Sequence, residues 1–84
     1  NHLNLLQLAR QDHRRGLLSQ QELDGWIVKA RYWFRPLWAD NTDTDIHEGR
    51  EVLRLVLLPE EGFPKEFRQW LVDMRIISSD LIAD

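Results

Sequence analysis

The stretch that decides the fold is Gly16-Leu-Leu-Ser-Gln-Gln-Glu-Leu-Asp-Gly-Trp-Ile-Val-Lys-Ala-Arg-Tyr-Trp-Phe34. Ser19 followed by Glu22 forms a capping box. In this motif the serine hydroxyl accepts a hydrogen bond from the amide three residues later, and the glutamate carboxylate accepts one from the serine amide. Behind it, apolar residues recur at the spacing of one helix face, and they are Leu23, Trp26, Ile27, Ala30 and Phe34. The pattern predicts an amphipathic helix over residues 20–34, on which the other elements are expected to pack.

The segments before and after this helix predict its neighbouring helix and the two positions at which it begins and ends. An earlier helix is expected over residues 2–12, with one apolar face made of Leu5, Leu8 and Ala9. Gly16 is the expected turn residue between the two helices, because glycine tolerates positive φ. Pro36 is expected to end the second helix, because a residue before proline avoids the helical region.

A third helix is predicted to begin after an N-cap at Thr42, Asp43 or Thr44 and to end near Leu58. Its candidate core residues are Ile46, Val52, Leu53, Val56 and Leu57. The apolar run 52–58 also fits a buried strand, since short apolar runs are ambiguous, but its length and capped start favour a helix.

After a turn at 59–62, a fourth helix is predicted with Pro64 at its first position. Its apolar residues at helical spacing are Phe63, Phe67, Trp70, Leu71 and Met74. Residues 76–79 are expected to end this helix, and another short helix can begin at Ser79. The sequence therefore predicts a single all-α domain over residues 1–84, with four helices in two helix-loop-helix units at 2–35 and 43–77.

Size and charge exclude several classes of protein. The 84 residues make one domain, and the start at Asn1 leads us to expect a piece of a longer protein. The absence of cysteine favours an intracellular, cytoplasmic location, and no apolar run has the length of a membrane span.

Residues 1–38 carry a formal charge of +3 and residues 39–84 carry −6. Nucleic acid is disfavoured as a partner, because the basic half lacks a dense Lys/Arg stripe.

The first unit resembles an EF-hand when Gln11 to Glu22 are aligned with the twelve-residue calcium loop. Gly16 then falls at the sixth position and Glu22 at the twelfth, where the family has its turn glycine and its bidentate carboxylate. Leu18 occupies the eighth position, where the family keeps an apolar residue. Gln11, His13 and Arg15 stand at the first, third and fifth positions, and such a loop should not hold calcium, which prefers anionic oxygen ligands.

The second unit is similar in a fainter form, with Phe63 in the place of Leu18 and Glu66 in the place of Glu22. The resemblance therefore implies a degenerate, calcium-free EF-hand pair. The run from Gly16 to Glu22, closing with Trp33 and Phe34, is similar to degenerate EF-hand segments of axonemal proteins such as sperm flagellar protein 2. This narrower similarity implies an axonemal location. The alternative is a plain four-helix domain whose glycine and capping box coincide with the EF frame.

No constellation for catalysis or for a cofactor is found in the sequence. The acidic stretch 40–45 fits a calcium loop poorly in either register and is interpreted as a solvated linker. The histidines, at positions 2, 13 and 47, form no zinc-binding spacing. Ser19 has no nucleophile context, and no phosphate-binding glycine loop is present. We therefore expect a non-catalytic protein without metal, cofactor or small-molecule substrate.

The stretch 31–38 contains more large aromatic and apolar residues than one helix face can bury. Some of these side chains are therefore expected to cover other helices or to be exposed. Tryptophan is enriched at binding hot spots. We expect a partner helix or peptide to dock on an aromatic surface made of Trp33, Leu37, Trp38 and Trp70. The alternatives are a calcium-responsive sensor and a helix-turn-helix nucleic-acid binder that uses the basic turn at Arg10, His13, Arg14 and Arg15.

Overall fold

The computed structural model describes residues 2–37, 44–57 and 62–82, and it contains four α-helices and two short 3₁₀ helices. In chain order these are α1 (His2–Arg14), α2 (Gln20–Phe34), η1 (Arg35–Leu37), α3 (Thr44–Leu57), α4 (Lys65–Asp73) and η2 (Ser79–Leu81). No strand occurs in these ranges, so the predicted all-α class is confirmed and the strand alternative for residues 52–57 is wrong.

α2 begins as its sequence predicts. The hydroxyl of Ser19 accepts from the amide of Glu22 at 3.1 Å, and the Ser19 amide donates to the Glu22 carboxylate at 3.3 Å, which completes the capping box. The apolar face behind this cap is buried at four positions, namely Leu23, Ile27, Ala30 and Phe34. Trp26, the fifth residue of the predicted stripe, is half-buried against the same core.

The end of α2 lies where predicted, at Phe34, but for a different reason. Arg35 keeps helical angles of φ −55° and ψ −40°, so the residue before Pro36 does not leave the helical region. The amide of Arg35 still donates to the carbonyl of Arg31, whereas Pro36 has no N–H to continue the ladder. The chain therefore tightens into η1 instead of extending.

α1 ends in a Schellman motif centred on Gly16. The amide of Leu17 donates to the Asp12 carbonyl at 2.8 Å, and the Gly16 amide donates to the His13 carbonyl at 3.0 Å. Gly16 has the expected positive φ, at 76°. The predicted apolar face of α1 is wrong in part, because Leu5 and Leu8 are exposed. The buried residues of α1 are instead Leu3, Leu6 and Ala9.

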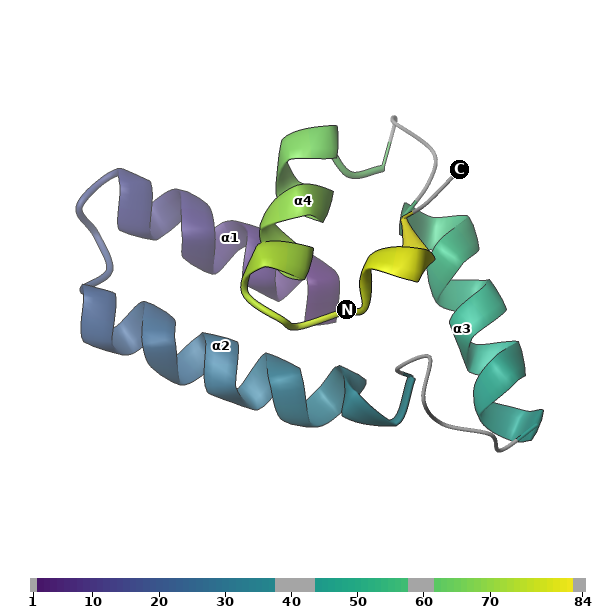
Figure 1. Cartoon of the computed structure of the whole chain (residues 1–84). Helices are drawn as coiled ribbons and strands as arrows, with labels where there is room; N and C mark the ends of the chain where they lie inside the picture. Colours follow the sequence, from purple (N-terminus) through teal and green to yellow (C-terminus); the bar gives the residue numbers. More distant parts are fainter. Residues whose placement is uncertain (1, 38–43, 58–61, 83–84) are drawn as a thin grey trace.

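α1 and α2 lie side by side and run in opposite directions (Figure 1). α4 is joined to α1 by the hydrogen bonds from Arg10 and Arg14 to Glu66. α4 is tied to α2 at its end, where Arg31 Nε donates to the Met74 carbonyl at 2.8 Å. Pro64 is the N-cap of α4 and not its first helical residue, and α4 ends at Asp73, earlier than predicted. The buried residues after α3 are Phe63, Phe67, Arg68, Leu71, Ile76, Ile77 and Leu81.

α3 lies at the end of the α1–α2 pair, and it contacts η1 and η2 (Figure 1). This placement makes the molecule elongated, with extents of 41 × 26 × 20 Å and a radius of gyration of 12.9 Å. A compact domain of this length would have a radius of gyration of about 12 Å. Of the predicted α3 core residues, Leu53 and Leu57 are buried, Val52 and Val56 are exposed, and the side chain of Ile46 lies outside the described part.

α4 ends in a second Schellman motif, and here the residue with positive φ is not a glycine. The Ile76 amide donates to the Leu71 carbonyl and the Arg75 amide to the Val72 carbonyl, both at 2.9 Å. Arg75 has a φ of 58°. A non-glycine residue in this region carries a steric cost between its Cβ and the backbone. Nothing in the sequence marks this position, since the usual glycine signal is missing.

Ser19→Ala should lower the free energy of unfolding by about 1 kcal/mol, because it removes the hydroxyl that accepts from Glu22. For a domain of this size, the corresponding fall in Tm is about 4–8 °C. Thermal unfolding followed by circular dichroism measures the change. Ser79→Ala is the matched control, since Ser79 is an exposed serine that caps no α-helix. An equal effect of the two substitutions would contradict the role of the capping box.

Arg75→Gly should raise the free energy of unfolding by about 1 kcal/mol, because glycine adopts positive φ without a Cβ clash. Urea unfolding of the two proteins measures this difference. Arg75→Ala is the control that separates the effect of the backbone conformation from the effect of losing the arginine side chain. Alanine keeps the Cβ, so no stabilisation is expected. If alanine stabilises as much as glycine does, the benefit comes from loss of the arginine side chain and not from the backbone.

Candidate functional site

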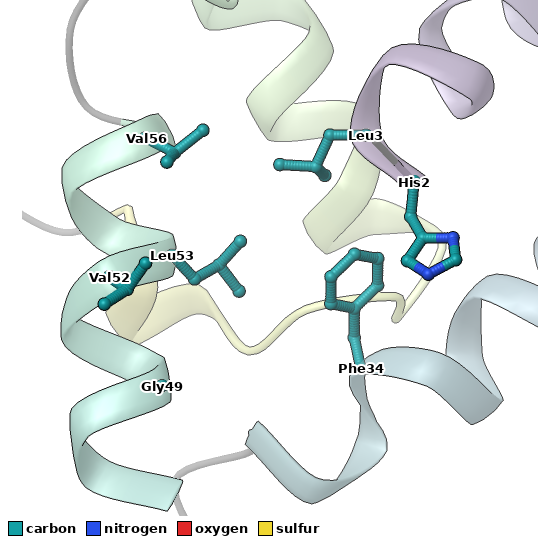
Figure 2. A pocket seen from close by; sticks show the side chains of 7 residues that line it. All are labelled: His2, Leu3, Phe34, Gly49, Val52, Leu53 and Val56. Carbon is teal, nitrogen blue, oxygen red and sulfur yellow. The ribbon is translucent and has the colours of Figure 1, made fainter.

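An apolar groove separates α3 from the α1–α2 pair. It encloses about 200 Å³. The side chains of Leu3, Phe34 and Leu53 point into the gap from the three helices (Figure 2). The complete lining is His2, Leu3, Phe34, Gly49, Val52, Leu53 and Val56. Apart from the imidazole of His2, every side chain in this lining is apolar, so the groove favours an apolar occupant.

The groove exists because α3 is apolar on more than one face. Leu53 and Leu57 are buried, and Leu53 also lines the groove. Val52 and Leu55 remain 62% and 70% exposed, and Val56 is 39% exposed. A surface helix normally shows one apolar stripe and an opposite polar face. The second apolar face of α3 has no partner within the described chain, and contiguous apolar surface of this kind is typical of interaction sites.

A polar clamp joins α3 to η1 and η2. Arg50 Nη1 donates to the Leu37 carbonyl at 2.6 Å, and Arg50 Nη2 donates to the carboxylate of Asp80. The Arg50 side chain is only 13% exposed. Beside it Leu37 packs on Gly49, where an added Cβ would lie 3.1 Å from Leu37 Cδ2. These contacts fix α3 to η1 and η2 and leave the space toward α1 and α2 open.

Trp33 and Leu37, two of the predicted docking residues, border this groove. The Trp33 ring stacks on His2, with ring centroids 4.1 Å apart and planes inclined by 28°. Its other neighbour is Trp26, at 6.5 Å in an edge-to-face arrangement. Leu37 reaches the groove through its contact with Gly49. Trp33 and Leu37 are both half-buried against the core, so they form the edge of the groove and not a free aromatic face.

Trp70, the third predicted docking residue, lies elsewhere, on α4. Its ring stacks on Phe67 at 5.8 Å, and the guanidinium of Arg10 lies 5.2 Å from its centroid. It is not part of the groove lining. Trp38, the fourth, lies outside the described residues. The predicted set is therefore divided between the groove and a separate surface formed by α1 and α4.

Sequence reasoning missed the residues that line the groove on α3. Their apolar character and helical spacing predict Val52 and Val56 in the core, whereas both are exposed and line the groove. The signal that could have found the site is the density of apolar residues from Val52 to Leu57, which exceeds what one helix face can bury. For Phe34 and Leu3 the sequence pattern cannot separate a groove residue from a core residue, because each is buried in the core and also lines the groove.

The residues aligned with the EF-hand loop form the end of α1, the turn after it and the N-terminal cap of α2. Gln11 and His13 lie within α1, which stays helical to Arg14. Arg15 and Gly16 form the end of the Schellman motif, and Glu22 is engaged in the capping box. A further frame residue, Leu18, packs half-buried on the core. The described residues contain no group of three or more His, Cys, Asp or Glu that could hold a metal, and residues 40–43 of the acidic linker lie outside them.

A charged cluster joins α1 to α4. Arg10 and Arg14 both donate Nη2 to the same oxygen, Oε1, of Glu66, and the Arg10 distance is 2.8 Å. Hydrogen bonds from Arg14 and Arg10 lower the pKa of the Glu66 carboxyl from its ordinary value of 4.5. Glu66 is the residue that the faint second EF frame places at the position of Glu22. In the structure its carboxylate binds two arginines.

Comparison with known proteins finds no matching family, no matching curated protein and no matching solved structure. The pairing of two EF-hand-like units and the axonemal similarity therefore stay predictions. None of the helices in the described ranges is long and apolar enough to cross a bilayer.

The lowered pKa of Glu66 predicts a pH-dependent contribution to stability. Because the folded state binds this proton less tightly, the ionised carboxylate stabilises the fold above about pH 4.5. The contribution is lost as the pH falls through the lowered pKa. The difference in free energy of unfolding between the parent protein and Glu66→Gln should therefore be constant near neutral pH and shrink below pH 4.5. Urea titrations at several pH values measure it, and a difference that persists at low pH would point to packing instead.

Proposed function

We propose that this chain is a non-catalytic protein-interaction module that docks a helix of a partner protein in the groove between α3 and the α1–α2 pair. The observation that carries the proposal is the apolar lining of the groove, continuous with the exposed side chains of Val52, Leu55 and Val56. The function is the one expected from the sequence. The docking site that we propose differs from the predicted one: it is the groove and not the aromatic cluster, and Trp33 and Leu37 lie at its edge.

The size of the groove favours a protein partner over a small molecule. Its volume is about 200 Å³. Pockets that bind drug-sized ligands measure about 300–1,000 Å³, whereas a cavity of about 150 Å³ is sufficient for benzene. One large apolar side chain fits, and the exposed valines of α3 give further contact area around it. This is the arrangement of an anchor residue surrounded by weaker apolar contacts.

The walls of the groove favour a helical partner. Both sides are helices, and the described chain has no strand whose edge could pair with an extended peptide. An amphipathic helix can place one side chain in the groove and neighbouring residues, three or four positions away, against Val52 and Leu55. Burial of these side chains supplies the free energy of binding, at about 25 cal/mol per Å² of apolar surface.

The alternatives have less support. The basic turn that a helix-turn-helix protein would use is partly neutralised, since Arg10 and Arg14 both bind Glu66. A calcium-responsive sensor would need Glu22 for the metal, and this carboxylate is hydrogen-bonded to the Ser19 amide. We therefore propose calcium-independent binding, with the EF-like frame used as scaffold.

The experiment is an NMR titration of the ¹⁵N-labelled protein with an amphipathic helical peptide that carries leucines at i, i+3, i+4 and i+7. The amides of Val52, Leu53 and Phe34 should shift, and added calcium should not change the result. Val52→Asp should weaken binding at least tenfold, because the charged carboxylate loses its water when the peptide covers it.

Val28→Asp is the matched control, since Val28 on α2 is 61% exposed and lies outside the groove. It should bind the peptide as the parent protein does. Equal weakening by the two substitutions, or shifts that avoid the groove, would contradict the proposal.

A further inference from the structure

Arg10, Arg14 and Trp70 form a second surface, separate from the groove. The two arginines lie one helical turn apart on the same side of α1, and Arg10 also lies over the Trp70 ring of α4. A hollow of about 450 Å³ opens beside Arg10 and Trp70. Its lining is Arg10, Lys65, Glu66, Gln69, Trp70 and Asp73.

The two guanidinium groups have more hydrogen-bonding capacity than Glu66 uses. Each carries five N–H donors, and each gives one Nη2 contact to the single oxygen Oε1 of Glu66. The three side chains together carry a formal charge of +1. Arg14 and Glu66 are also accessible, with side chains 54% and 63% exposed. The Arg10 side chain is only 15% exposed, so a carboxylate from outside reaches the donors of Arg14 and is attracted by the neighbouring charge of Arg10.

We propose that this surface binds an acidic segment of a protein partner. A carboxylate of the segment is held by Arg14, next to the charge of Arg10, and an adjacent aliphatic side chain packs on Trp70. Glu66 supports this chemistry, because its own carboxylate already shows that the arginine pair accepts one. The surface is independent of the proposed groove, since it uses other residues on α1 and α4.

The charges around the site favour a carboxylate over the phosphates of a nucleic acid. Glu66 and Asp73 both border the hollow and repel any anion, so an anion is held only where it pairs with the arginines, and the closely spaced charges of a phosphate backbone cannot all do so. Phosphate-rich ligands require a stripe of cations, and the lining of the hollow adds only Lys65 to the arginines. Glu66 also acts as an internal competitor: its exposed carboxylate must share the arginines with the incoming one, or leave them.

The test uses the blocked peptide acetyl-Leu-Glu-Asp-Leu-Glu-amide, titrated into the full chain at low salt and followed by the indole N–H signal of Trp70. Affinity should fall about tenfold in Arg14→Gln, because the variant loses a charge-assisted contact. Arg15→Gln, which removes the same charge from the neighbouring exposed residue, should change affinity less than twofold. Glu66→Gln should increase affinity severalfold, because the competitor is removed.

Four controls keep the proposal open to refutation. A peptide with Gln and Asn in place of Glu and Asp should not bind, and Val52→Asp should not alter the acidic peptide's affinity. Circular dichroism should show that Arg14→Gln stays folded, since the Arg10–Glu66 pair remains. Equal effects of Arg14→Gln and Arg15→Gln, or no gain in Glu66→Gln, would overturn the proposal. It would also be overturned if a DNA duplex bound as tightly with the same dependence on Arg14.

Discussion

Burial of the apolar stripe of α2 is the interaction on which the other elements depend. Leu23, Ile27, Ala30 and Phe34 are each at most 8% exposed, and they belong to one core with residues of every other helix. The capping box starts α2 at a defined residue and thereby sets which side chains face that core. α1 covers one flank of the stripe, and Arg31 ties the end of α4 to the other.

Polar contacts then determine how the shorter elements are attached. α4 is joined to α1 through Glu66, with Arg10 and Arg14 on the same carboxylate. α3 is joined to η1 and η2 through Arg50, which reaches the Leu37 carbonyl and Asp80. In both attachments a charged arginine donates to a carboxylate, so these hydrogen bonds are charge-assisted. Their geometry also has a consequence for function, because the Arg50 clamp leaves a gap between α3 and the long helices.

The two surfaces proposed for binding follow from these attachments. The groove is apolar because α3 carries more apolar residues than η1 and η2 can cover, and it is small enough to select a single anchor side chain. The cluster beside Trp70 carries one excess positive charge, because Arg10 and Arg14 share the single carboxylate of Glu66. One surface suits an apolar helix and the other an acidic segment, so a single partner that presents both could engage them together.

The helices themselves were determined by the sequence. The capping box at Ser19, the stripe from Leu23 to Phe34 and the turn at Gly16 rest on neighbours within a few residues, and local patterns describe such contacts well. The boundaries of α2 were correct to the residue, although Arg35 showed that the reason for its end is the missing N–H of Pro36.

Only the tertiary structure decided which apolar residues are covered. Leu5, Leu8, Val52 and Val56 have the composition and spacing of core residues, yet they are exposed. Trp33 and Trp70, expected on one surface, contact opposite ends of α1. The αL residue at Arg75 likewise carries no sequence signal. Local periodicity shows that a helix has an apolar face, but how much of that face is buried depends on the distance to partners far away in the sequence.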